Sequence, residues 1–153
     1  MTNFQQAFAA AAPRFIEVAY GFALHSDKVD KLWVYVTEED GVSVAEAFFL
    51  ADGRYLQAFE MGGAISGVDS SPDGQDALFD GLLDVLNELY DEAESLPTRM
   101  IIYYVPATKE MGADFYYGEL QPGVADRDLL PDATLAEHWF ERLAATGEDS
   151  ATL

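Results

Sequence analysis

The stretch KLWVYVTEEDGVSVAEAFFLADGRYLQAFEM, residues 31–61, decides the fold, because three apolar runs in it are separated by two sharp turn signals. The runs are Lys31–Thr37, Val42–Leu50 and Arg54–Met61. Their β-branched and aromatic residues favour strands. Glu39-Asp40-Gly41 supplies the first turn and Asp52-Gly53 the second, and an Asp-Gly pair between apolar runs is typical of a tight hairpin. We therefore predict an antiparallel meander of three strands.

Three other segments have the spacing of amphipathic helices, with apolar residues every three or four positions. They are Asn3–Leu24, Asp76–Leu96 and Thr134–Ala145. Pro13 interrupts the first segment and lacks the N–H of a helical hydrogen bond, so we expect a kink or a second helical piece there. In the second segment we expect Phe79 and Tyr90 to share the buried stripe with the leucines, and Pro97 to end the helix.

The remaining strand signals form a second hairpin, Arg99–Ala107 with Ala113–Leu120, around a turn at Lys109–Gly112. The resulting order is α-β-β-β-α-β-β-α. Short connections predict a mainly antiparallel sheet of about five strands, with helices packed mostly on one face. We expect one α+β domain over residues 1–153, in which the tail Gly147–Leu153 frays.

Composition limits the class of protein. The 153 residues carry a formal charge of −20, yet half are hydrophobic and 13% are aromatic, which argues against intrinsic disorder. The absence of cysteine excludes disulfides and thiolate sites. No apolar run approaches the ~18 residues of a membrane span, and the N-terminus lacks the basic segment of a signal peptide. We expect a soluble cytoplasmic protein that does not bind membranes or, because it lacks clustered cations, nucleic acid.

Every charged side chain within residues 56–97 is a carboxylate. Asp80, Asp84 and Glu88 recur every four residues and Asp91 follows after three, so the four share one helix face. Like charges at this spacing destabilise a helix by about 0.2–0.5 kcal/mol per pair. The face is either the solvated side of an acidic protein or a negative ridge that docks on a basic partner.

Tyrosines in the predicted strands are the second candidate contact. Side chains alternate across a sheet, so one of Tyr103 and Tyr104, and one of the corresponding pair Tyr116 and Tyr117, should lie on the less covered face. We take Tyr35, Tyr103 and Tyr116 as candidate partner anchors, because tyrosine is favoured at interfaces. Plain surface packing or a homodimer contact is the alternative.

Catalytic and metal-binding patterns are weak. His138 and Glu141 are three residues apart on the last predicted helix, but the other ligands of a metal site are missing. Asp69–Asp76 resembles a calcium loop only superficially, because it contains Pro72 and has Asp80 where that loop needs a glutamate. No carboxylate pair shows the contrasting environments that acid–base catalysis requires. We therefore predict no catalytic residue, metal or cofactor.

The order of elements also carries a resemblance to a known family. KLWVYV, AEAFFLADGRYLQAF, ALFDGLLDVLNELYDEAE, ADFYYGEL and AEHWFERL follow one another along the chain. This layout resembles the YezG-like immunity proteins of bacterial polymorphic toxin systems. The matching positions are Asp114, Tyr116, Tyr117, Glu119, Leu120, Trp139, Glu141 and Arg142. The resemblance implies a small, acidic, non-enzymatic protein that is expressed with a cognate toxin, often a nuclease.

Three hypotheses follow from the sequence. The first is an immunity protein that neutralises a basic toxin domain. The second is an acid-adapted soluble protein whose charge serves only solubility. The third is a small enzyme or ligand-binding domain of an unfamiliar type.

Overall fold

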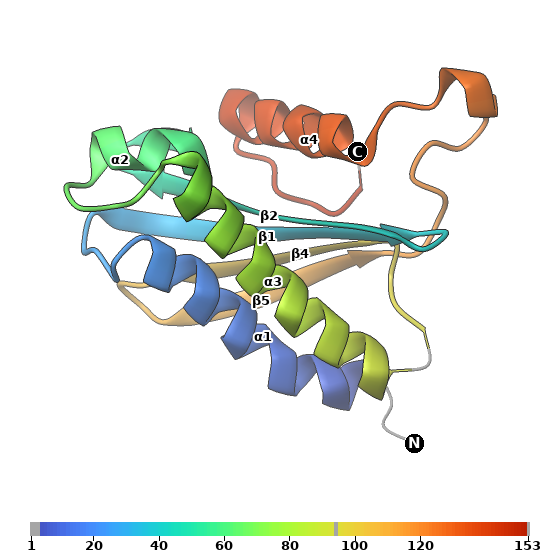
Figure 1. Ribbon diagram of the computed structural model, residues 1–153, viewed down its shortest axis with the longest axis horizontal. Helices are drawn as coiled ribbons and strands as arrows, with labels where there is room; N and C mark the ends of the chain where they lie inside the picture. Colours follow the sequence, from blue (N-terminus) through green and yellow to red (C-terminus); the bar gives the residue numbers. More distant parts are fainter. Residues whose placement is uncertain (1–3, 94, 153) are drawn as a thin grey trace.

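A computed structural model describes residues 4–93 and 95–152, which form a five-stranded antiparallel sheet and four α-helices (Figure 1). The sheet has the order β3-β2-β1-β4-β5. Its strands are β1 (Val29–Glu39), β2 (Val42–Ala51), β3 (Arg54–Gln57), β4 (Arg99–Val105) and β5 (Glu110–Tyr116). The helices are α1 (Phe4–Phe22), α2 (Met61–Ala64), α3 (Pro72–Glu92) and α4 (Asp132–Thr146), with short 3-10 turns η1 (Ala58–Glu60) and η2 (Asp126–Asp128). The predicted α+β class and the order of the elements are confirmed.

Both Asp-Gly turns form as predicted. Asp40 and Gly41 have φ of 53° and 80°, and Asp52 and Gly53 have φ of 51° and 74°. Positive φ at both central residues is the geometry of a type I′ turn, whose twist matches that of the flanking strands. The first turn therefore joins β1 to β2, with Glu39 directly opposite Val42.

Several predicted boundaries were wrong for local reasons. β3 ends at Gln57, because the chain turns into η1, where the Glu60 carboxylate accepts the Gln57 N–H at 2.9 Å. The Lys109–Gly112 turn falls earlier, because β5 already starts at Glu110. The first helix is one continuous α1 that contains Pro13, so no second helical piece begins there. The predicted start of that helix at Asn3 lies outside the described residues.

The second predicted helix, Asp76–Leu96, corresponds to α3, and both of its ends differ from the prediction. α3 starts at Pro72, because the Ser71 hydroxyl accepts the Gly74 N–H at 3.2 Å and proline suits the first helical position. It ends at Glu92, before the predicted Leu96, because the backbone of Ala93 is extended. Residue 94 is outside the described part of the chain.

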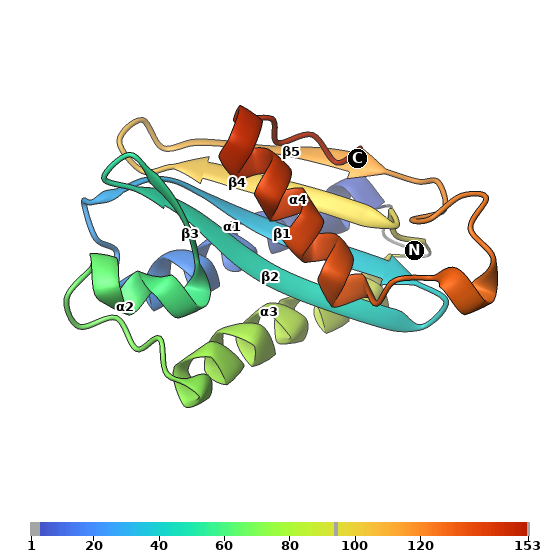
Figure 2. The ribbon, with the colours of Figure 1, turned by 90° about the horizontal axis from the view of Figure 1, so that it is seen from above.

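The sheet separates two hydrophobic cores. Figure 2 shows α4 crossing the near face of the sheet, with α1 behind the strands. The first, with Phe15, Phe49 and Leu82, lies under α1 and α3 and includes residues of α2. The second lies under α4, where the Trp139 ring is stacked on Phe48 with centroids 5.7 Å apart. Most helices therefore share one face as predicted, while α4 covers part of the opposite face.

The C-terminal segment Gly147–Thr152 lies against the sheet, so the predicted fraying was wrong. The Asp149 carboxylate accepts hydrogen bonds from Lys31 Nζ at 3.0 Å and from Trp33 Nε1 at 2.9 Å. Ala151 is fully buried, and its N–H donates to the Asp114 carboxylate at 2.6 Å. Leu153, also part of the predicted tail, lies outside the described residues.

Low pH should weaken the hydrogen bonds by which Asp149 holds the C-terminal segment against the sheet. Burial raises the pKa of the Asp149 carboxyl, but hydrogen bonds from Trp33 and Lys31 and the Lys31 charge outweigh it, so the pKa lies below its ordinary value. The stabilisation is then complete above the unfolded pKa of about 4 and is lost as the pH falls through the lower folded pKa.

Asp149→Asn is therefore expected to lower the free energy of unfolding at pH 7 by about 1 kcal/mol, a figure discounted for a carboxylate that is one-third exposed. Urea titrations at pH 7, 5 and 3 should show this difference shrinking below about pH 4. The exposed Asp126→Asn is the matched control. A loss that is the same at all three pH values would contradict the assignment.

Self-repulsion gives a second prediction. With a charge of −20, like charges surround the folded chain, and added salt screens them over about 10 Å at 0.1 M. We expect the Tm to rise with NaCl, by about 2–4 °C for each 1 kcal/mol of repulsion relieved. Sucrose at the same osmolality is the control. It is excluded from the protein surface but carries no charge, so it cannot screen the carboxylates. A Tm that is flat or falls with NaCl would show that self-repulsion does not limit stability.

Candidate interaction surface

The solvent side of α3 carries the predicted row of carboxylates. The opposite side of α3 is buried against the rest of the protein. Its buried residues recur every three or four positions and are Leu78, Leu82, Val85, Leu86 and Leu89. This packing against α1 and β2 fixes the rotation of the helix. Asp80, Asp84, Glu88 and Asp91 are consequently all exposed, and the structure brings the four together on one surface. We call them the α3 acidic row.

One member of the α3 acidic row is partly neutralised. The Arg14 guanidinium of α1 forms an ion pair with Glu88, and both side chains are about half exposed. Asp80, Asp84 and Asp91 have no basic partner among residues 4–93 and 95–152. These three carry the uncompensated charge of the row.

Two aromatic side chains flank the row, and their position corrects the sequence analysis. Phe79 is 37% exposed and Tyr90 is 40% exposed, although both were predicted in the buried stripe. The stripe centres instead on Leu78 and Val85, so both aromatic rings lie at its margins. The i, i+4, i+7, i+8 and i+11 spacing from Leu78 is the signal that could have placed them there.

Tyr90 lies beside Asp91, at the end of the row. Burial, a hydrogen bond to the Glu38 carboxylate and the Glu38 charge raise the pKa of Tyr90 to about 12. The phenol therefore stays neutral over the whole physiological range. Its ring is 40% exposed and is therefore available to a partner.

Tyr35 cannot act as an anchor, so that prediction was wrong. It is fully buried beneath α4, with its ring 5.5 Å from that of Trp139. Its hydroxyl accepts a hydrogen bond from Arg99 Nε at 3.2 Å. Burial raises the pKa of this phenol, although the nearby Arg99 opposes the shift. A partner could reach the ring only after α4 had moved away.

Tyr103 and Tyr116 are half-buried on the α4 side of the sheet. The Lys31 ammonium lies over the Tyr103 ring, 4.4 Å from its centroid. The Tyr116 hydroxyl donates to the Glu119 carbonyl at 3.0 Å. Because α3 packs on the other face, these tyrosines do not form one surface with the acidic row.

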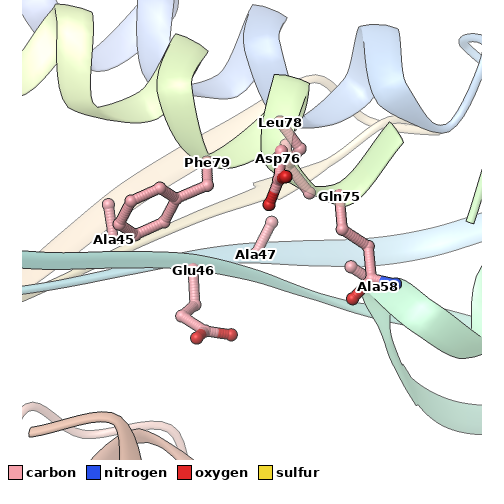
Figure 3. A pocket seen from close by; sticks show the side chains of 8 residues that line it. All are labelled: Ala45, Glu46, Ala47, Ala58, Gln75, Asp76, Leu78 and Phe79. Carbon is pink, nitrogen blue, oxygen red and sulfur yellow. The ribbon is translucent and has the colours of Figure 1, made fainter. Parts of the chain in front are cut away.

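A groove lies between α3 and β2, beside the row (Figure 3). It has a volume of about 200 Å³ and is lined by Ala45, Glu46, Ala47, Ala58, Gln75, Asp76, Leu78 and Phe79. The Phe79 ring lies over Ala45, while the Glu46 side chain extends to the other face of the sheet. Burial raises the pKa of the Glu46 carboxyl, and repulsion from the Glu137 charge raises it further by a smaller amount. The groove thus combines a largely apolar lining with the Asp76 carboxylate, because Glu46 points away from it.

Within the described ranges, no three potential ligand side chains are grouped closely enough to hold a metal ion. None of the helices in that part of the chain has the length and apolar character needed to cross a membrane. The sequence matches no protein-family model, and the search of curated proteins gives no match.

Proposed function

We propose that the protein is an acidic, non-enzymatic binding protein, and specifically a cytoplasmic immunity protein that neutralises a basic, nuclease-type toxin domain. The observation that carries the proposal is the exposed α3 acidic row, flanked by the accessible rings of Phe79 and Tyr90. Unpaired carboxylates beside exposed aromatic rings combine the two components of a protein interface, a charge that steers and a ring that anchors.

The physical case rests on complementary charge. A nuclease cleft is positive because it holds phosphates. An acidic surface can occupy that cleft or its rim, and opposite fields accelerate the encounter of the two proteins. The sequence resemblance to YezG-like immunity proteins supports the same class of partner.

Co-expression with the product of the neighbouring gene tests the proposal. The expected result is a stable complex with a basic domain, loss of that domain's nuclease activity in the complex, and survival of cells that express both proteins. A pull-down from the source cell provides an independent search for the partner. A neighbouring product that does not bind, together with no basic protein in the pull-down, would contradict the immunity function.

A further inference from the structure

A second groove opens where the end of α1 lies beside the beginning of α3 (Figure 1). We call it the α1–α3 groove. It has a volume of about 340 Å³ and a mainly apolar lining. An engineered cavity of about 150 Å³ binds a benzene ring, so the α1–α3 groove can take a large apolar side chain. Its lining includes Val18, Phe22, Leu24, Asp69, Ala77 and Leu78.

Leu24 forms an exposed wall of this groove. Its side chain is 53% exposed, and its backbone has a φ of 59°. Positive φ is disfavoured for a bulky residue, and glycine is the residue commonly found in this conformation at a helix end. The side chain lies over the backbone of Gly67, where a Cβ would come within 3.2 Å of the Leu24 Cδ1. A strained and exposed leucine that lines a groove is typical of a contact site, because strained residues cluster where proteins bind.

Carboxylates surround the α1–α3 groove. Asp69 lines it, and hydrogen bonds from the hydroxyl and then the N–H of Ser71 hold the pKa of that carboxyl below its ordinary value. Asp73 and Asp80 stand four residues before and three residues after Ala77, so they share its side of α3. None of these three carboxylates forms an ion pair with a cation of the described residues. The charge around the groove therefore favours a basic occupant.

We propose that a basic protein inserts a bulky apolar side chain into the α1–α3 groove, and that lysines or arginines beside that side chain face Asp69, Asp73 and Asp80. This inference rests on the proposed function, because it names the contact that holds the basic partner. The groove supplies the apolar anchor, and the carboxylates select the charge of the anchor's neighbours. A second copy of the chain is a poor occupant, since it would bring a charge of −20 to the same surface.

Two substitutions change the groove from exposed positions. Leu24→Asn removes the apolar wall and keeps the backbone conformation, because asparagine adopts positive φ more readily than leucine. Ala77→Gln fills the groove with a good helix former. The matched controls are Leu129→Asn, at a leucine that is 45% exposed, and Ala144→Gln, on the exposed side of α4. Thermal melts establish that each variant is folded, so a loss of binding at an unchanged Tm reports the contact.

The probe is a synthetic pentapeptide with one phenylalanine between two pairs of lysines, titrated into the labelled protein and followed by NMR. One control peptide has serine in place of the phenylalanine, and the other has glutamates in place of the lysines. The probe is expected to shift the amide resonances of Leu24, Gly67 and Ala77. Leu24→Asn and Ala77→Gln should each weaken its binding by about fivefold or more, whereas the two matched controls should not.

Several results would overturn the inference. They are equal binding of either control peptide, resonance shifts confined to other segments, absence of binding, and binding of the probe unchanged by Leu24→Asn and Ala77→Gln. A parent protein that is dimeric, with a monomeric Leu24→Asn variant, would overturn it in favour of a second copy.

Two further outcomes separate this inference from the proposed function. A co-purified basic partner that binds Leu24→Asn and Ala77→Gln as tightly as the parent would leave the function standing and overturn the groove contact. If the probe binds the groove and no basic partner exists in the cell, the groove chemistry stands and the immunity function fails.

Discussion

Replacing Trp139 with alanine is expected to lower the free energy of unfolding by about 3–5 kcal/mol, a large part of the 5–15 kcal/mol typical of a domain. The indole is fully buried between α4 and the sheet, against Tyr35 and Phe48. Its Nε1 also donates to the Ser150 carbonyl at 2.8 Å, so the substitution leaves a cavity and releases the C-terminal segment.

Urea titration followed by circular dichroism measures this effect. Tyr117→Ala is the control, because that ring is 65% exposed and its removal should change stability by no more than about 0.5 kcal/mol. A loss below about 1 kcal/mol for Trp139→Ala would mean that α4 does not share a core with the sheet.

Reversing the charge of the α3 acidic row should slow association with the basic partner by 10- to 1,000-fold, the range attributed to electrostatic steering. The variant is Asp80→Lys, Asp84→Lys and Asp91→Lys together. Glu88 is kept, because its reversal would place a lysine beside Arg14 and disturb the contact between α1 and α3. Stopped-flow or surface-plasmon-resonance association rates at several salt concentrations give the measurement.

The control reverses three exposed carboxylates outside α3, Glu110, Glu119 and Asp126. Both variants change the net charge equally, so a difference between them reports the position of the charge. The parent rate should also fall steeply with salt, and the α3 variant should lose that dependence. If both variants associate as fast as the parent, the row is only a solvated helix face.

The parts of the fold that local chemistry determines were predictable. Asp40-Gly41 and Asp52-Gly53 specify their turns without help from the rest of the chain. The C-terminal segment was not predictable, because Lys31, Trp33 and Asp114, which hold it, are far from it in sequence.

The candidate site was predictable to a similar extent. A spacing of four residues is enough to place Asp80 and Asp84 on one helix face. Alternation along a strand assigns Tyr35 to one side of the sheet, but it cannot show that α4 covers that side. The helical spacing of Leu78, Leu82 and Val85 could have placed Phe79 at the margin of the stripe, but the prediction centred the stripe on Phe79 instead.

The position of β1 in the middle of the sheet has a consequence for the folding pathway. Its pairing with β2 closes a two-residue loop, whereas its pairing with β4 sets Leu32 opposite Tyr104 across a long segment that includes α3. Local contacts form quickly, and distant ones first incur the entropy of closing a long loop. The β1–β2 hairpin should therefore nucleate the sheet, and the docking of β4 should set the folding rate. Mutations along the β1–β4 seam would then slow folding, while mutations in β3 would mainly accelerate unfolding.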